Sequence, residues 1–351
     1  MPNEYIYFLS FILFIILMLS IDLGIFNKKD HIVGFKEAAT MSFIWVSFAI
    51  VFYVLLLTKG QELHGIENYT QLAEVTKRHL HNITLIPSNF EESLRIYKQN
   101  LALEFLTGYV IEYALSVDNI FVMVLIFSAF SVPEKYYHRV LVWGIIGAVM
   151  MRFMFIFLGA TLIARFEWIL YIFGAFLVYT GLMMFFNRND DEKIDTENHK
   201  IVRLASRFFS VYPHFAGNKF FIKIEGKRFI TPLFVVLMIV EFTDLIFAVD
   251  SIPAIFAVTK DPYIVFFSNI FAILGLRSMF FLLVNIIHKF HYLKVGLAVL
   301  LVFIGVKMLA HHWLSAWGFT TMHSLFIILG ILTLSVVSSL LFPKKAETGL
   351  E

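Results

Sequence analysis

The chain lacks cysteine altogether and has few charged residues for its length. The absence of cysteine excludes disulfides, thiolate metal sites, iron–sulfur clusters and cysteine nucleophiles. Charged residues make up 15% of the 351 residues, whereas about 25% is usual in soluble domains. No Lys or Arg precedes the first apolar run, so we expect a retained N-terminal helix and not a cleaved signal peptide. The sequence also contains no phosphate-binding loop, nucleophile triad or HExxH motif, so we predict neither an enzyme nor a bound cofactor.

In place of charge the chain has long hydrophobic runs, with 59% hydrophobic residues. A membrane-spanning helix needs about 20 mostly apolar residues, and nine segments meet this length. We therefore predict an all-α polytopic membrane protein that lies in the lipid bilayer and binds no nucleic acid. The nine predicted spans are residues 4–26, 37–58, 101–130, 136–163, 166–186, 230–258, 262–287, 293–311 and 322–342.

The distribution of Lys and Arg between the predicted loops indicates the orientation. With the N-terminus outside, 18 of these residues fall on the cytoplasmic side and seven on the other. Positive charge is enriched in the cytoplasmic loops of membrane proteins. We therefore predict a multi-pass protein of the cell (inner or plasma) membrane, with its N-terminus outside and its C-terminus in the cytoplasm.

Two polar segments divide the predicted spans. Residues 59–100 are expected outside the membrane, with a short helix around Tyr69–Leu80, and residues 187–229 are expected to form a cytoplasmic linker whose basic part lies against the inner leaflet. The remaining units are two N-terminal helices (1–58), two three-helix units (101–186 and 230–311) and a C-terminal helix with its tail (312–351).

An acidic motif occurs twice within the apolar spans. Glu112 precedes Asp118 by six residues, and Asp244 precedes Asp250 by the same interval. An amide or hydroxyl residue follows each second acid. Ionisable groups within a span are costly and are usually functional, so these motifs are the first candidates for a site.

Further matches extend the motif into a repeat of three helices. Arg152 follows Asp118 by 34 residues, and Arg277 follows Asp250 by 27. Gly181 and Gly305 lie a further 29 and 28 residues on. Units with an odd number of spans enter the membrane from opposite sides, which predicts the inverted repeat of secondary transporters. The alternative is chance similarity among Phe-rich and Leu-rich helices.

The acids of the two units are predicted to bind a metal ion. Carboxylate and amide oxygens suit Mn²⁺, Mg²⁺ or Ca²⁺, whereas Zn²⁺ and Cu²⁺ favour His or Cys. Arg152 and Arg277 are expected in the same layer, for gating or charge pairing. The structural alternative is that these arginines pair with the acids and only hold the helices together. The predicted metal ligands are Asp118, Asp250, Glu112, Glu241, Asp244 and Asn119.

The spacing of the acids leaves two arrangements open. Six residues of helix advance about 9 Å and turn about 240°, so Glu112 and Asp118 cannot share an ion on an unbroken helix. Either the helices unwind near the aspartates, or the acids form a relay of separate positions. Unwinding is favoured in the second unit, because Pro253 cannot donate to the carbonyl of Val249.

Other polar residues received weaker assignments. Glu104 is expected to attract cations at the outer mouth, and Asn269 to lie in the bilayer as a donor to a neighbour. His64, His79 and His81, in the 59–100 segment, are expected to be solvated or satisfied and not to be ligands.

Three segments of the sequence resemble the TerC family of integral membrane proteins, in particular its Alx-like branch. They are Ala102–Val122, Glu241–Thr259 and Ser268–Arg277. The resemblance implies membership of the LysE-like transporter group and export of Mn²⁺ from the cytoplasm, with the acids of the third and sixth helices acting on the metal. In this family a short loop usually joins helices two and three, so the 59–100 segment is interpreted as an insertion.

The resulting prediction is a divalent-cation exporter that works by alternating access, with Mn²⁺ as its ion and Ca²⁺ or Mg²⁺ less favoured. Coupling to protons is a hypothesis, based on the need for ligating carboxylates to lose their protons. The alternatives are a membrane assembly or metal-delivery factor with protein partners of unknown identity, and a tellurium-resistance protein. The 59–100 segment is expected to be dispensable for transport.

Overall fold

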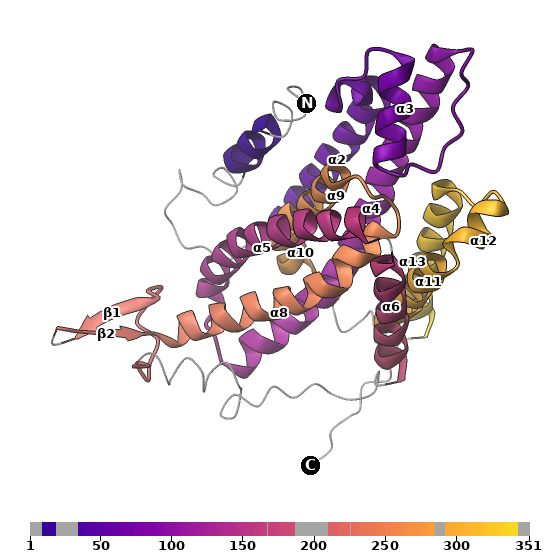
Figure 1. Cartoon of the computed structure of the whole chain (residues 1–351). Coiled ribbons are helices and arrows are strands. Elements are labelled where there is room, and N and C mark those ends of the chain that lie inside the picture. The colour runs from indigo at the N-terminus through magenta and orange to yellow at the C-terminus, as the bar shows by residue number, and fades with distance from the viewer. Residues whose placement is uncertain are drawn as a thin grey trace.

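A computed structural model describes residues 9–18, 34–166, 168–186, 210–224, 226–284 and 292–342. The described chain is mostly helical (Figure 1), so the predicted all-α membrane architecture is confirmed. A short antiparallel hairpin of β1 (Phe221–Ile224) and β2 (Lys227–Ile230) precedes the second set of helices. It lies in the predicted cytoplasmic linker, where the sequence did not lead us to expect strands.

Within this part of the chain, six helices are long and apolar enough to cross a membrane, and a bent pair makes a seventh. The pair is bent by 40° at Gly275, between α9 and α10. The six are α2 (Phe35–Leu63), α4 (Phe90–Ala129), α5 (Tyr137–Arg165) with its 3₁₀ turn η1 (Glu134–Tyr136), α6 (Ile169–Phe186), α8 (Pro232–Phe256) and α13 (Thr321–Leu341), and the pair is α9 (Pro262–Leu274) with α10 (Leu276–Leu283).

The remaining helices are shorter. Predicted spans 4–26 and 293–311 contain a helix at Leu9–Met18 and α11 (Leu293–Leu309), respectively. The other two are α3 (Tyr69–Arg78) and α12 (His311–Ala316). The count of nine spans therefore stays a prediction, whereas the short helix expected in the 59–100 segment is present as α3.

Helix α4 is much longer than a bilayer requires. Asn89 caps it by accepting a hydrogen bond from the backbone N–H of Glu92 at 3.0 Å, and two glutamates favour its first turn. Its 40 residues extend about 60 Å, roughly twice the thickness of the hydrocarbon core. The 59–100 segment is thus largely helical, because α2 continues to Leu63 and α4 begins at Phe90.

Helices α6 and α11 approach each other closely at glycines. A Cβ added to Gly181 would lie 2.8 Å from the carbonyl oxygen of Ala298, and one added to Gly305 would lie 2.7 Å from that of Gly174. Ala298 precedes Gly305 by seven residues, as Gly174 precedes Gly181. The contact is therefore reciprocal, and small residues are what permit such an approach between membrane helices.

The other helices of the two units exchange partners in the same way. Helix α4 packs on α9, and its counterpart α8 packs on α5, while α4 and α8 also contact each other. Figure 1 shows α4 starting at the end that carries α3, and α8 starting beside the β hairpin. Reciprocal packing of this kind is expected of an inverted repeat; the repeat itself stays a prediction.

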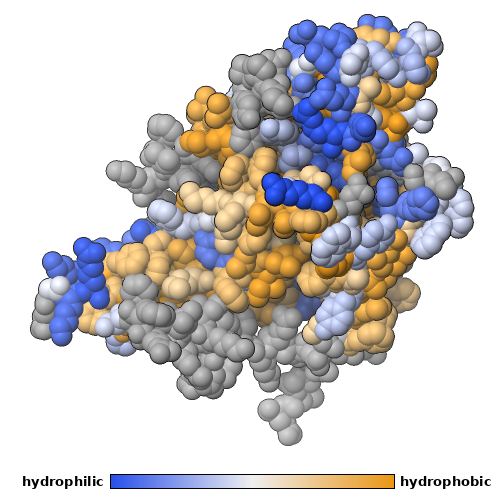
Figure 2. Space-filling view, viewed as in Figure 1, coloured by the Kyte–Doolittle hydropathy of each residue, from blue (hydrophilic) through white to orange (hydrophobic). Residues whose placement is uncertain are grey.

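The face of the molecule shown in Figure 2 has a hydrophobic middle and two hydrophilic ends. Figure 2 shows mostly apolar residues over the long helices, and hydrophilic residues over the α3 region and the β hairpin. Large apolar side chains such as Phe43, Met150 and Leu334 are at least two-thirds exposed. Exposed apolar area on this scale is typical of a surface that contacts lipid.

Candidate functional site

Arg152, on α5, is the centre of a buried polar network. It is completely buried, and its guanidinium donates to Glu112 Oε1 on α4. It also donates to Asp244 Oδ1 on α8 at 3.2 Å and to Asn269 Oδ1 on α9 at 3.1 Å. Asn269 in turn donates through Nδ2 to Glu112 Oε2 at 3.0 Å, as its predicted role required. Four helices therefore meet at one polar point.

The network joins acids that hold the same place in the two motifs. Glu112 stands six residues before Asp118, and Asp244 six before Asp250. A buried ion without a partner would cost several kcal/mol, so Arg152 stabilises both carboxylates. One guanidinium faces two acids, and the group keeps a net negative charge when all three are ionised.

Glu241 lies beside this network, on the same helix face as Asp244. It is half-buried and packs against α5 at Gly147, where any added Cβ would overlap its carboxylate. Gly147 thus leaves the space in which the carboxylate sits. Sequence reasoning did not identify Gly147, because nothing local distinguishes it from the other glycines of the spans.

Among the described residues, two buried carboxylate oxygens have no hydrogen-bond partner. They are Asp244 Oδ2 and Asp250 Oδ1, both on α8. Asp250 is half-buried and lies near Thr180 of α6, whose hydroxyl donates to the carbonyl of Phe176 at 3.0 Å. A buried acceptor without a donor is unfavourable, so each of these oxygens is a place where a cation would be stabilised. Thr180 was also not identified from the sequence, since a lone threonine in a span carries no signal.

In the first unit, the residues that correspond to Asp250 and Ser251 are Asp118 and Asn119 on α4. Asn119 is buried and Asp118 is half-buried, about 9 Å beyond Glu112 along the helix. Of the two arrangements left open, unwinding near the aspartates is absent: α4 is continuous through Asp118, and α8 is continuous through Asp250 with Pro253 inside it. Successive acids therefore point in different directions, as in a relay.

The acids also do not converge on one compact position. Among the residues that the structure describes, no three of the five predicted carboxylates bring ligand atoms within 4.8 Å of one another. The structure brings together Glu112 and Asp244, with Glu241 beside them, and leaves Asp118 and Asp250 further along their helices.

The expectation that Arg277 shares the layer of Arg152 is wrong. The Nη1 atom of Arg277 lies 2.7 Å from Nε2 of His138, near the start of α5. Arg152 follows His138 by 14 residues, which is about 21 Å of helix. Arg277 also follows Asn269, which contacts Arg152, by eight residues, or about 12 Å of helix, so matching by residue number placed it in the wrong layer.

Glu104, expected at the outer mouth, is instead buried and hydrogen-bonded. It accepts from Thr259 Oγ1 at 2.6 Å and from Asn100 Nδ2 at 2.7 Å, and its Oε1 lies 3.0 Å from His81 Nδ1. It holds the 59–100 segment and the α8–α9 connection together. The pKa of His81 is raised, because the Glu104 carboxylate outweighs the lowering effect of burial.

These features define a polytopic membrane protein with a charged network inside its helix bundle. The chain belongs to the integral membrane protein TerC family, whose model matches residues 97–347. The match begins after most of the 59–100 segment.

Relatives with similar sequences extend over nearly the whole chain. It is 44% identical over 343 residues to "Uncharacterized membrane protein STKORF319" of Myxococcus xanthus, covering 97% of this chain and 93% of that protein. It is 42% identical over 334 residues to "Putative membrane-bound redox modulator Alx" of Salmonella typhi, covering 93% and 92%. The protein of that name in Escherichia coli K12 is 42% identical over 306 residues, covering 86% and 84%. No solved structure matches the chain.

Proposed function

We propose that this protein is a divalent-cation transporter that carries Mn²⁺ out of the cytoplasm by alternating access of the two three-helix units. The observation that supports it is the pair of unpartnered carboxylate oxygens, Asp244 Oδ2 and Asp250 Oδ1, inside the helix bundle. Oxygen donors of this kind suit Mn²⁺, Mg²⁺ and Ca²⁺.

The ion would pass along the acids one at a time. Glu241 and Asp244 form one position, and Asp250 with Thr180 forms the next, about 9 Å along α8. Glu112 is paired with Arg152 and adds negative charge to the interface between α4 and α8. We do not assign it as a position on the path of the ion. Proton release would accompany binding, since carboxylates that bind metal must be deprotonated.

The reciprocal packing supports a rocking motion of the two units. At the glycine contact, few side chains interlock between α6 and α11. The two units could therefore shift against each other as rigid bodies. With the N-terminus outside, the α3 end of the molecule would face away from the cytoplasm, and the ion would leave toward that end.

The rival functions differ in what they require of this site. The name of the Salmonella typhi and Escherichia coli relatives describes a redox modulator. This chain has no cysteine, so a redox role would follow indirectly, from control of a redox-active metal such as manganese. An oxyanion such as tellurite would be repelled by the acids. An assembly or metal-delivery factor would need no bulk transport.

Transport by the purified protein tests the proposal. Proteoliposomes that contain only this protein should take up Mn²⁺, and Asp118→Asn or Asp250→Asn should reduce the initial rate at least tenfold. Glu91→Gln, which alters an exposed acid at the start of α4, is the matched control and should transport like the parent. Normal rates in either folded Asp variant would exclude the acids as ligands, and an inactive parent would favour the assembly factor.

A further inference from the structure

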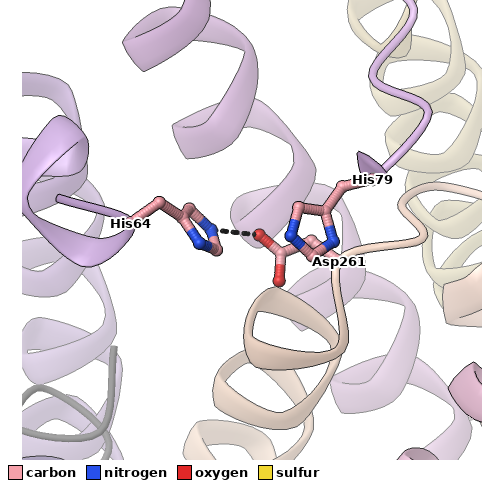
Figure 3. Close-up of side chains that lie close together, drawn as sticks. All are labelled: His64, His79 and Asp261. Carbon is pink, nitrogen blue, oxygen red and sulfur yellow. Dashed lines mark hydrogen bonds and ion pairs between the residues drawn. The ribbon is translucent and has the colours of Figure 1, made fainter. Parts of the chain in front are cut away.

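A second polar cluster joins the 59–100 segment to the membrane helices. His64 follows the end of α2, His79 follows the end of α3, and Asp261 precedes α9. The residues are 5%, 9% and 0% exposed, respectively. Figure 3 shows the two imidazoles reaching the Asp261 carboxylate from different elements. Segments nearly 200 residues apart thus bring together three buried side chains of types that can ligate a metal ion.

The geometry of this cluster is that of an open ligand set. His64 Nε2 lies 2.8 Å from Asp261 Oδ2, and one ligand atom from each of the three residues lies within 4.8 Å of the others. In a zinc site, metal–ligand bonds of about 2.0–2.2 Å place ligand atoms about 3.4 Å apart. A small rotation of His79 would bring the set to that spacing.

One nitrogen of the cluster has no partner. Asp261 Oδ1 already caps α9 by accepting from the N–H of Tyr263 at 2.9 Å, which leaves Oδ2 for His64. The Nε2 atom of His79 is buried without a hydrogen-bond partner. A buried imidazole nitrogen in this state is unfavourable, and an ion between the three side chains would satisfy it.

The neighbouring His81 also has a buried Nε2 without a hydrogen-bond partner, but its Nδ1 lies against a carboxylate. It is paired with Glu104, whose oxygens also accept from Asn100 and Thr259. That group already fastens the segment to the α8–α9 connection. His79 makes no such bond, so holding the segment in place does not account for it.

Burial and neighbouring charges shift the pKa values of two members of the cluster. Burial lowers the pKa of His79, so its imidazole is neutral, as a ligand must be. Burial alone would raise the pKa of Asp261, but the imidazoles of His64 and His79 outweigh it and hold that pKa well below its usual range. The cluster thus offers the imidazoles of His64 and His79 and one carboxylate.

We propose that His64, His79 and Asp261 bind a divalent transition-metal ion that favours imidazole, with Zn²⁺ as the best fit. The donor set differs from the all-oxygen acids of the membrane site, and zinc is commonly held by two His and a carboxylate. The ion would replace the proton between His64 and Asp261 and would tie the ends of α2 and α3 to the start of α9. This proposal does not depend on transport.

Zinc binding to the full-length protein in detergent tests the site. After removal of metals with EDTA, titration calorimetry with Zn²⁺ should show one tight site, and Zn²⁺ should raise the melting temperature. His79→Ala should raise the Kd at least tenfold and abolish the thermal shift. It should fold, since His79 makes no hydrogen bond through its side-chain Nε2; His79→Gln serves if it does not.

Two controls separate the outcomes. His214→Ala removes an exposed histidine near the β hairpin and should leave the tight site intact. Asp250→Asn removes a membrane acid and should also leave it intact, so the transport and zinc proposals can fail independently. Parent protein without a tight Zn²⁺ site, or His64→Ala and His79→Ala variants that bind as the parent does, would overturn the proposal, and the cluster would then be a hydrogen-bonded clamp.

Discussion

The two three-helix units, α4–α6 and α8–α11, pack through reciprocal contacts but bring different charges to their interface. Gly181 on α6 meets Ala298, and Gly305 on α11 meets Gly174 in the same way. Their arginines break the correspondence. Arg152 lies at the centre of the polar network, whereas Arg277 contacts His138 near the start of α5. The two predicted units thus make corresponding helix contacts at Gly181 and Gly305, whereas their arginines lie in different surroundings.

The difference has an electrostatic consequence. With both arginines in one layer, Glu112 and Asp244 would be fully neutralised and would attract no cation. With Arg152 alone between them, the pair retains negative charge. The placement of Arg277 outside this layer is therefore consistent with a site that receives a positive ion.

The largest effect is expected from removing the central arginine. Arg152→Met leaves Glu112 and Asp244 buried without their partner, and breaking a buried ion pair in this way costs about 3–5 kcal/mol. Little folded protein should remain, as measured by size-exclusion chromatography and thermal melting. Arg277→Met should be milder, because Arg277 lies outside this network.

The same experiment can contradict the comparison. Equal losses of folded protein in the Arg152→Met and Arg277→Met variants would mean that both arginines neutralise buried acids to the same extent. The sequence match alone predicts that result. Adding Glu112→Gln and Asp244→Asn to Arg152→Met should recover part of the folded protein, because the unpaired charges are then gone.

A middle-sized effect tests the shared framework. Gly181→Leu and Gly305→Leu each place a side chain against the backbone of the facing helix, and overpacking of this kind costs about 1–3 kcal/mol. The two variants should lose similar amounts in thermal melts, since the contact is reciprocal. Gly330→Leu on α13 is the control, because nothing lies within 4 Å of a Cβ added there. Clearly unequal losses at Gly181 and Gly305 would show that the α6–α11 contact is not symmetric in energy.

Much of the architecture could be predicted from the sequence, because hydrophobic length fixes where helices cross a membrane. The short connection between α5 and α6, the α3 helix and the donor role of Asn269 were all predicted. The motif acids Glu112 and Asp244 were also assigned as a pair of equivalent residues, and the structure places both on Arg152.

The errors arise where distant segments meet. Arg277 contacts His138 of α5, and matching the two units by residue number could not reveal that contact. The sequence does not predict His64 and His79 as ligands, because Asp261 lies nearly 200 residues away and a histidine in a polar segment has no distinctive spacing. Glu104 was placed at an open mouth for the same reason, although the segment it holds covers it.

The smallest effect concerns Pro253, which only the second unit contains; the first has Phe121 at the matching place. Pro253→Ala restores one backbone donor toward Val249, and the recovered hydrogen bond is worth about 1 kcal/mol. The melting temperature should rise slightly. Because α8 is already continuous through Asp250, the affinity for Mn²⁺, measured by titration calorimetry, should stay within about twofold of the parent. A large loss of affinity would mean that the Val249 carbonyl is a ligand in a state with an unwound α8. The two units would then differ in their ion-binding backbone as well as in their arginines, and the relay along continuous helices would be wrong.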